Sequence, residues 1–147
     1  MELIRKRFAE LTADELYEIL RLRAAVFVVE QSCAYQDIDG RDRGALHIWL
    51  RDADGIQAYL RVMNSDDTHP CPTIGRVIAV KRRCGLGTRI VHEGIAAARE
   101  CFGAERIYLE AQVYAKELYE KCGFTQVTEP FDEDGIPHIG MELIITD

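Results

Sequence analysis

The sequence has no long run of apolar residues, and this absence excludes a membrane-spanning helix. The longest such run, residues 24–29 of the 147-residue chain, is far shorter than the roughly 20 residues that a bilayer requires. Residues 1–7 are charged and no long apolar segment follows them, so no signal peptide is predicted. We therefore expect a cytoplasmic protein with no membrane partner.

The sequence also lacks the usual patterns of disulfide-rich and metal-binding domains. Its five cysteines are an odd, widely spaced set without a CxxC pair, which indicates a reducing compartment rather than a disulfide framework. Its four histidines show no HxxxH or Cys/His ligand spacing. No metal site is predicted.

Positive charge is in deficit, because the formal net charge of the chain is −7. Nucleic-acid binding needs a basic surface that displaces counterions, so we expect no nucleic-acid partner. The exception is a local cluster of basic side chains beside a pair of glycines. It consists of Arg76, Lys81, Arg82, Arg83 and Arg89. This cluster indicates a phosphorylated ligand.

The composition that is present is that of an ordinary soluble domain, with 48% apolar and 29% charged residues. The chain contains no linker, repeat or low-complexity segment, so residues 1–147 are expected to form one domain. Thr12 and Glu15 have the spacing of a capping box, which marks the start of a helix.

Hydrophobic periodicity predicts alternating strands and helices. Strands are expected over residues 2–8, 45–51, 56–63, 73–80, 106–112, 124–131 and 136–145. Helices are expected over residues 13–29, 85–102 and 115–122. The strand–helix–strand unit of residues 73–112 requires parallel strands and a right-handed crossover. The predicted fold class is α/β (α+β), a mixed sheet of about seven strands with helices on both faces.

A glycine turn lies between the strand of residues 73–80 and the next helix. Gly85 and Gly87 let the backbone turn tightly and approach a ligand closely. The first amides of a helix have no partner within it and lie at the positive end of its dipole, which suits a pyrophosphate. A Walker A motif is absent, and Ile90 stands where a dinucleotide-binding fingerprint needs a third glycine. A Rossmann fold opens with its glycine turn and continues as repeated βαβ units, whereas here antiparallel strands come first and too little chain follows, so that fold is discounted.

Two motifs resemble those of the GNAT N-acetyltransferase superfamily. The pattern Arg82-x-x-Gly85-x-Gly87 resembles its pyrophosphate-binding motif, and residues 119–124, preceded by Ala115, resemble its YxxxGF segment. The predicted order of elements agrees with that superfamily along nearly the whole chain. Similarity to the ElaA-like branch is carried by residues 25–31, 35–40 and 134–141.

The resemblance implies that acetyl-CoA lies where the parallel strands of residues 73–80 and 106–112 splay apart. Ile78 and Val80 would pair with pantetheine, and the Val80 amide would donate to the oxyanion of the tetrahedral intermediate. The amides of residues 83–88 would hold the pyrophosphate. The implied cofactor-binding residues are Ile78, Val80, Arg82, Arg83, Cys84, Gly85, Leu86, Gly87, Thr88 and Ala115.

The implied reaction is direct attack of an amine on the thioester. Tyr119 matches the family position of the acid that protonates the thiolate of CoA. A base must deprotonate the amine, and Glu110 and His138 are the candidates, while Gln112 could instead position a water. The segment that borders the acceptor in this superfamily contains three carboxylates, which would select a cation or be surface charge. They are Glu30, Asp37 and Asp39.

Two other interpretations stay open. One is a non-catalytic acyl-CoA-binding or regulatory module with the same fold, and the other is a nucleotide-binding oxidoreductase. The substitution Tyr119→Phe separates an enzyme from a binding module, since only an enzyme has turnover to lose. Thermal stabilisation by NAD(P) rather than by CoA would identify the oxidoreductase.

Overall fold

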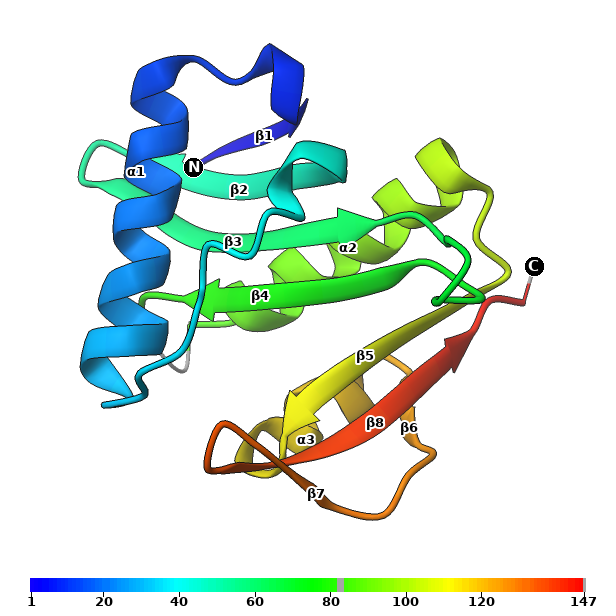
Figure 1. Cartoon of the computed structure of the whole chain (residues 1–147). Helices are drawn as coiled ribbons and strands as arrows, with labels where there is room; N and C mark the ends of the chain where they lie inside the picture. Colours follow the sequence, from blue (N-terminus) through cyan, green and yellow to red (C-terminus); the bar gives the residue numbers. More distant parts are fainter. Residues whose placement is uncertain (82–83, 147) are drawn as a thin grey trace.

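Eight strands form one mixed sheet in the computed structural model, which describes residues 1–81 and 84–146 (Figure 1). The strands are β1 (Glu2–Arg7), β2 (Ala45–Asp52), β3 (Gly55–Met63), β4 (Thr73–Ala79), β5 (Arg106–Gln112), β6 (Thr125–Gln126), β7 (Phe131–Glu133) and β8 (Ile136–Ile144). Their order is β1-β2-β3-β4-β5-β8-β6, and β7 also pairs with β8. Only β4 and β5 pair in parallel in the described chain. The predicted mixed sheet is confirmed.

Helices cover both faces of this sheet, as predicted (Figure 1). The three α-helices are α1 (Ala13–Arg23), α2 (Leu86–Phe102) and α3 (Lys116–Lys121). Short helical turns are η1 (Phe8–Glu10), η2 (Ala24–Glu30), η3 (Asp42–Gly44) and η4 (Val113–Ala115). Helix α1 lies on one face, and α2 and α3 lie on the other. No helix in the described ranges has the length and apolarity that crossing a bilayer requires.

Helix α1 begins at the predicted capping box. The Glu15 amide donates to the Thr12 hydroxyl at 3.1 Å, and the Thr12 amide donates to the Glu15 carboxylate at 2.9 Å. The helix predicted for residues 13–29 continues that far, but its backbone widens into π-type turns over η2. Helix α1 packs its buried Ile19 against the sheet, where Trp49 and Tyr59 form a second apolar core.

Helix α2 packs closely on the opposite face, and Gly94 is the residue that permits this approach. A Cβ atom on Gly94 would lie 2.9 Å from Cδ2 of Leu60 in β3, which is closer than a side chain tolerates. Gly103 ends the helix, with a left-handed φ of 59° and its amide hydrogen-bonded to the Arg99 carbonyl at 3.0 Å.

The predicted strand over residues 124–131 is wrong as a single element, because the structure splits it into β6 and β7. Between them, the Thr128 hydroxyl accepts the Gly140 amide of β8 at 2.8 Å, in place of a backbone carbonyl. Pro130 follows and has no amide hydrogen to add to a ladder. This break is why the sheet has eight strands rather than about seven.

Strands β4 and β5 meet at one end and then diverge (Figure 1). Thr73 and Tyr108 are the one pair in register between them in the described residues, and the Tyr108 amide donates to the Pro72 carbonyl at 3.1 Å. We call the diverging residues, 74–79 of β4 and 109–112 of β5, the β4–β5 fork. The predicted pair of splayed parallel strands is therefore confirmed.

Strand β4 contains a bulge where it pairs with β3. Gly75 pairs with Arg61 and Ile78 pairs with Tyr59, so two residues of β4 stand opposite one residue of β3. Arg76 lies in this bulge with a φ of 56°, a left-handed conformation that residues other than glycine rarely adopt.

Candidate functional site

The amino end of α2 presents backbone amides beside the β4–β5 fork. Gly85 is the N-cap residue, with a left-handed φ of 74°, and it carries no side chain to accept the first amides. The first backbone hydrogen bond of the helix is donated by the Arg89 amide to the Gly85 carbonyl, at 3.0 Å. The amides of Leu86, Gly87 and Thr88 precede that bond, so they form the positive end of the helix dipole. This arrangement suits an anion.

Gly87 lets the amino end of α2 lie close to α3 and β4. A Cβ atom there would stand 3.3 Å from both terminal carbons of Leu118 in α3, and 3.9 Å from Cβ of Ala79 in β4. The helix end is thus packed between α3 and the tip of β4. Cys84 and Arg89 are exposed beside it. The predicted cofactor residues Arg82 and Arg83 lie outside the described residues.

The end of β4 contradicts the prediction for Val80. Its amide donates to the Gln57 carbonyl of β3 at 2.9 Å, so it does not face the fork as an oxyanion donor. Successive residues of an antiparallel strand turn their backbone groups to opposite sides. Ile78, which pairs with Tyr59, therefore also turns its amide and carbonyl toward β3, and Ala79 turns its own toward the fork. Of these three residues, only Ala79 turns its backbone groups toward the fork.

Tyr119 lies buried on α3, on the α2 side of the sheet, where Ala115 is packed nearby. Its ring meets Phe124 edge to face, with centroids 6.2 Å apart. Burial raises the pKa of Tyr119, and the nearby Tyr114 and Cys122 add to this effect. No hydrogen bond to its hydroxyl occurs within the described residues. The raised pKa keeps the phenol protonated at neutral pH, so its hydroxyl can donate a hydrogen bond.

Polar side chains of β5 and β8 lie on the other side of the sheet. Ile107, Leu109 and Ala111 of β5 are buried in the core that contains α2. The alternating residues therefore point to the α1 side. They are Tyr108, Glu110 and Gln112, which stand opposite Glu142, Gly140 and His138 of β8.

The Tyr108 hydroxyl donates to the Glu110 carboxylate at 3.2 Å. Burial and the charge of Glu110 raise the pKa of Tyr108 to about 12. Gly140 makes room for this ring, because a Cβ atom there would lie 2.5 Å from the tyrosine oxygen. The predicted candidates Glu110, Gln112 and His138 are thus brought together on one polar face.

The segment of residues 31–33 crosses from the end of η2 to the far side of the fork. Gln112 Nε2 donates to Gln31 Oε1 at 3.2 Å, and the Cys33 thiol donates to the Asp134 carbonyl at 3.3 Å. The first contact reaches β5, and the second reaches the turn between β7 and β8. Glu30, predicted to bind the acceptor, is exposed at the end of η2 just before this segment.

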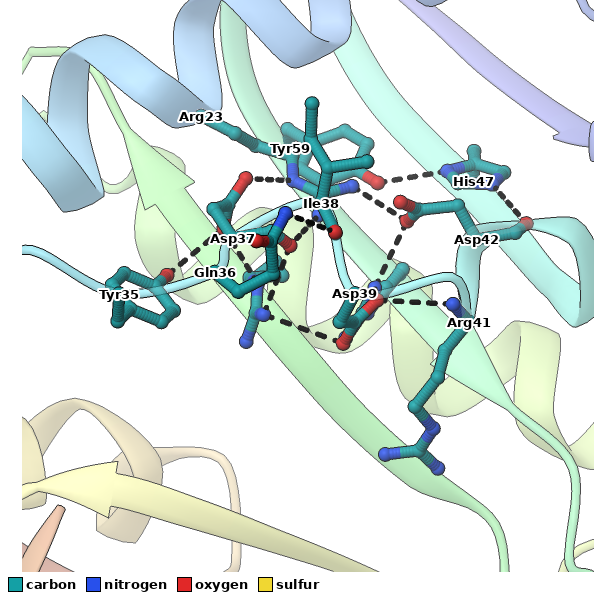
Figure 2. A network of polar contacts seen from close by, with 12 residues as sticks. Arg23, Tyr35, Gln36, Asp37, Ile38, Asp39, Arg41, Asp42, His47 and Tyr59 are labelled. Atoms are coloured by element: carbon teal, nitrogen blue, oxygen red, sulfur yellow. Dashed lines mark hydrogen bonds and ion pairs between the residues drawn. The ribbon is translucent and has the colours of Figure 1, made fainter. Parts of the chain in front are cut away.

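A buried ionic network holds the following loop, residues 34–44, against β3 and β4 (Figure 2). Arg23 of α1 is fully buried, with Nε 3.1 Å from Asp37 and Nη1 2.6 Å from Asp42. Arg61 of β3 is 2% exposed, with Nη1 2.9 Å from Asp42 and Nη2 2.6 Å from Asp39. Burial alone would raise the pKa of Asp39, but the hydrogen bonds from Arg61 outweigh it and hold that pKa well below its usual range.

Arg76 joins the network at the fork. Its Nε lies 2.8 Å from Asp37 as an ion pair without hydrogen-bond alignment, and its guanidinium stands 5.4 Å from the ring centroid of Tyr35. Two predictions are corrected here. Asp37 and Asp39 are committed to arginines and do not offer charge to a cationic acceptor. Arg76 faces this loop, so it is not part of a phosphate-binding cluster.

His47 closes the network on the β2 side (Figure 2). Its Nε2 lies 2.9 Å from the Asp42 carbonyl, and its Nδ1 lies 2.8 Å from the Tyr59 hydroxyl. A carbonyl only accepts hydrogen bonds, so Nε2 carries the hydrogen and Nδ1 accepts from the hydroxyl. Burial lowers the pKa of His47 and favours this neutral form.

Other hollows of the chain do not contribute to this arrangement. One of about 420 Å³ lies at the closed end of the fork, with Cys71, Pro72 and Arg106 in its wall. No cluster of possible metal ligands occurs within residues 1–81 and 84–146.

Comparison with known proteins identifies related chains. A family model described as an acetyltransferase (GNAT) domain matches residues 12–145, which include the fork, the amino end of α2 and Tyr119. Protein ElaA of Escherichia coli (strain K12) is 42% identical over 137 residues, 90% of each chain. The crystal structure of E. coli ElaA matches with a TM-score of 0.90 and 39% identity, over 97% of this chain and 98% of that chain. The crystal structure of an acyl-CoA N-acyltransferase from Pseudomonas aeruginosa matches with a TM-score of 0.88 and 38% identity, over 97% of this chain and 99% of that chain.

Proposed function

The chain belongs to the acetyltransferase (GNAT) family and to its ElaA-like branch, and we propose that it transfers an acetyl group from acetyl-CoA to a primary amine of a small molecule or peptide. The observation that carries this proposal is the juxtaposition of two features. The β4–β5 fork leaves backbone groups of β4 without a parallel partner, and the amino end of α2 stands at the tip of the same strand.

These two features fit the two ends of an acyl-CoA molecule. The amides of residues 86–88 suit the pyrophosphate, because they combine unpaired donors with the positive end of a helix. The amide and carbonyl of Ala79 suit the amide groups of pantetheine, which would lie along β4 as an added strand. The thioester would then reach the middle of the fork, where the Ala79 amide is our candidate donor to the oxyanion.

The proposed chemistry uses both faces of the sheet. An alkyl amine has a pKa near 10.4, so only about one molecule in 10³ is free base at pH 7 and a base must take a proton. The polar face of β5 and β8 supplies candidates for that base in Glu110 and His138. On the opposite face, Tyr119 would give its proton to the departing thiolate. Acceptor and CoA would thus enter from opposite sides and meet in the fork.

The first test is a thermal-shift comparison of acetyl-CoA, CoA and NAD(P). We expect stabilisation by the first two and none by NAD(P). Failure of acetyl-CoA to stabilise the chain would remove the basis of the proposal. Release of CoA thiol would then be followed with a panel of polyamines, amino acids, aminoglycosides and N-terminal peptides.

The second test is Tyr119→Phe, which removes only the hydroxyl. Loss of turnover with unchanged affinity for acetyl-CoA is the expected result, and general acid catalysis of this kind is typically worth roughly 10²–10⁴-fold. The matched control is Tyr17→Phe, since Tyr17 is 71% exposed on α1, on the other side of the sheet. Binding of acetyl-CoA without turnover in the native chain, for every amine, would favour a regulatory acyl-CoA-binding module.

The cysteines support a reducing compartment for this reaction. None of the five forms a disulfide in the part of the chain that the structure describes. Cys33, Cys71 and Cys122 are buried, so they behave as small apolar side chains. We propose the cytoplasm as the location of the activity.

A further inference from the structure

The hairpin of β7 and β8 brings together a carboxylate and an imidazole that no sequence motif links. His138 Nε2 lies 3.4 Å from Glu133 Oε2. The His138 side chain is 11% exposed and the Glu133 side chain is 45% exposed. Phe131, which pairs with His138 across the hairpin, stacks on the imidazole with centroids 6.2 Å apart. The ring is therefore held in one orientation, with one edge toward Glu133.

The other edge of the ring determines which nitrogen carries a hydrogen. His138 Nδ1 lies 2.7 Å from the Ile136 carbonyl oxygen. A carbonyl only accepts hydrogen bonds, so the hydrogen of the neutral ring must be on Nδ1. The lone pair is then on Nε2, the atom nearest Glu133. A proton that arrives at Nε2 gives an imidazolium beside a carboxylate, which is a favourable pair.

The charged groups around this pair place it at the fork. His138 stands opposite Gln112, the last residue of β5. Glu133 interacts electrostatically with Glu110 of β5, Asp134 of the turn and Arg76 of β4, which lies across the fork. Burial raises the pKa of Glu133, the two neighbouring carboxylates add to this, and His138 and Arg76 oppose it. The pair thus faces the region that the acceptor amine would enter.

We propose that His138 Nε2 is the atom that takes the proton of the acceptor ammonium, and that Glu133 is a positioning residue that stabilises the imidazolium formed. This proposal rests on the proposed acetyl transfer. The ammonium gives one proton to Nε2, and the free amine forms a bond to the thioester carbon while the carbon–sulfur bond breaks. The thiolate takes the Tyr119 proton, and the phenolate recovers a proton from the new amide nitrogen. The His138 proton is released to water, so the sum is N-acetyl product, CoA thiol and one proton.

The test compares Glu133→Gln with Glu129→Gln, which removes an exposed carboxylate a few residues earlier. The dependence of kcat/KM on pH is measured for both and for His138→Gln. We expect His138→Gln to lose roughly 10²-fold or more at neutral pH, as removal of a positioned base typically does. We expect Glu133→Gln to lose about tenfold and to move the acidic limb of the profile to lower pH. Glu129→Gln should change neither kcat/KM nor the position of the acidic limb.

The second measurement does not depend on turnover. The ring nitrogen signals of His138 are compared by NMR in the native chain, in Glu133→Gln and in Glu129→Gln. The native chain should carry the hydrogen of the neutral ring on Nδ1. Glu133→Gln should shift the Nε2 signal, because it removes the carboxylate beside that atom, and Glu129→Gln should not. An unchanged Nε2 signal and an unchanged profile in Glu133→Gln would overturn the proposal. A native chain that transfers no acetyl group would remove the proposed function, while the NMR comparison would still decide whether the two residues act as a pair.

Discussion

Removal of the Asp42 carboxylate should destabilise the protein far more than loss of a surface charge. Its Oδ1 accepts from Arg23 at 2.6 Å and from Arg61 at 2.9 Å, and these arginines are 0% and 2% exposed. Breaking a buried ion pair by removal of one partner costs about 3–5 kcal/mol. Each arginine keeps another carboxylate, Asp37 or Asp39, so we expect Asp42→Ala to cost the lower value, about 3 kcal/mol.

Urea unfolding followed by tryptophan fluorescence measures this cost. Trp49 is the single tryptophan, and it is 2% exposed, so its emission reports on the folded core. A cost of about 3 kcal/mol lowers the midpoint by roughly 1–3 M for slopes of about 1–3 kcal/mol/M. The slope itself should not change, because the same surface is exposed on unfolding.

The control is Glu100→Ala, which removes an ion pair with Arg5 between side chains that are 63% and 28% exposed. Surface pairs of this kind contribute about 0–1 kcal/mol. If Asp42→Ala costs no more than Glu100→Ala, the network is not desolvated and the reasoning fails. The variant Asp42→Asn, which keeps the shape of the side chain, then separates the effect of charge from that of packing.

Three further outcomes are expected. Stability to urea should fall as the pH drops below about 6.5. Burial lowers the pKa of His47 in the folded state, so below that pH protons bind preferentially to the unfolded chain. The variant His47→Gln should therefore show a weaker dependence of stability on pH between about pH 5 and 7. Gly94→Val should destabilise by about 1–3 kcal/mol in the same assay, because its Cβ meets Leu60; an unchanged midpoint would show that α2 can move away from the sheet. Gly140→Ala should lower acetyl transfer while acetyl-CoA still stabilises the chain, because the new methyl group displaces Tyr108; equal turnover would exclude a role for that ring.

The elements around the site were predictable because their signals are local. The capping box at Thr12, the apolar stripe of α2 and the glycine at its end each involve residues a few positions apart. The parallel relation of β4 and β5 followed from the crossover rule, which needs only the order of the elements. The divergence of these strands came from the family resemblance, since no periodicity encodes it.

The error at Val80 has a specific cause. A bulge at Arg76 adds one residue to β4 and shifts which backbone groups face the neighbouring strands. A residue with positive φ that is neither glycine nor asparagine gives no sequence signal for such a bulge. The prediction for Val80 therefore fell one position away from Ala79, the residue that turns toward the fork.

The ionic network was missed because its partners are far apart in sequence. The acidic loop resembled surface charge, and nothing local pairs Asp37 with Arg23 or Asp39 with Arg61. One signal was present, since Arg61 is the one charged residue in the sequence of β3. A buried guanidinium needs carboxylates nearby, and the acidic loop contains the ones it found.

Because β4 and β5 diverge, the sheet has two unpaired strand edges in its interior. Beyond the Thr73–Tyr108 pair, the fork sides of β4 and β5 carry amides and carbonyls that pair with no neighbouring strand of the described chain. Unpaired strand edges of this kind are where β-proteins aggregate. A pantetheine arm bound there would act as an added strand and would cover both edges. If acyl-CoA binds as proposed, it would also limit self-association of the protein at these edges, and its removal would increase aggregation.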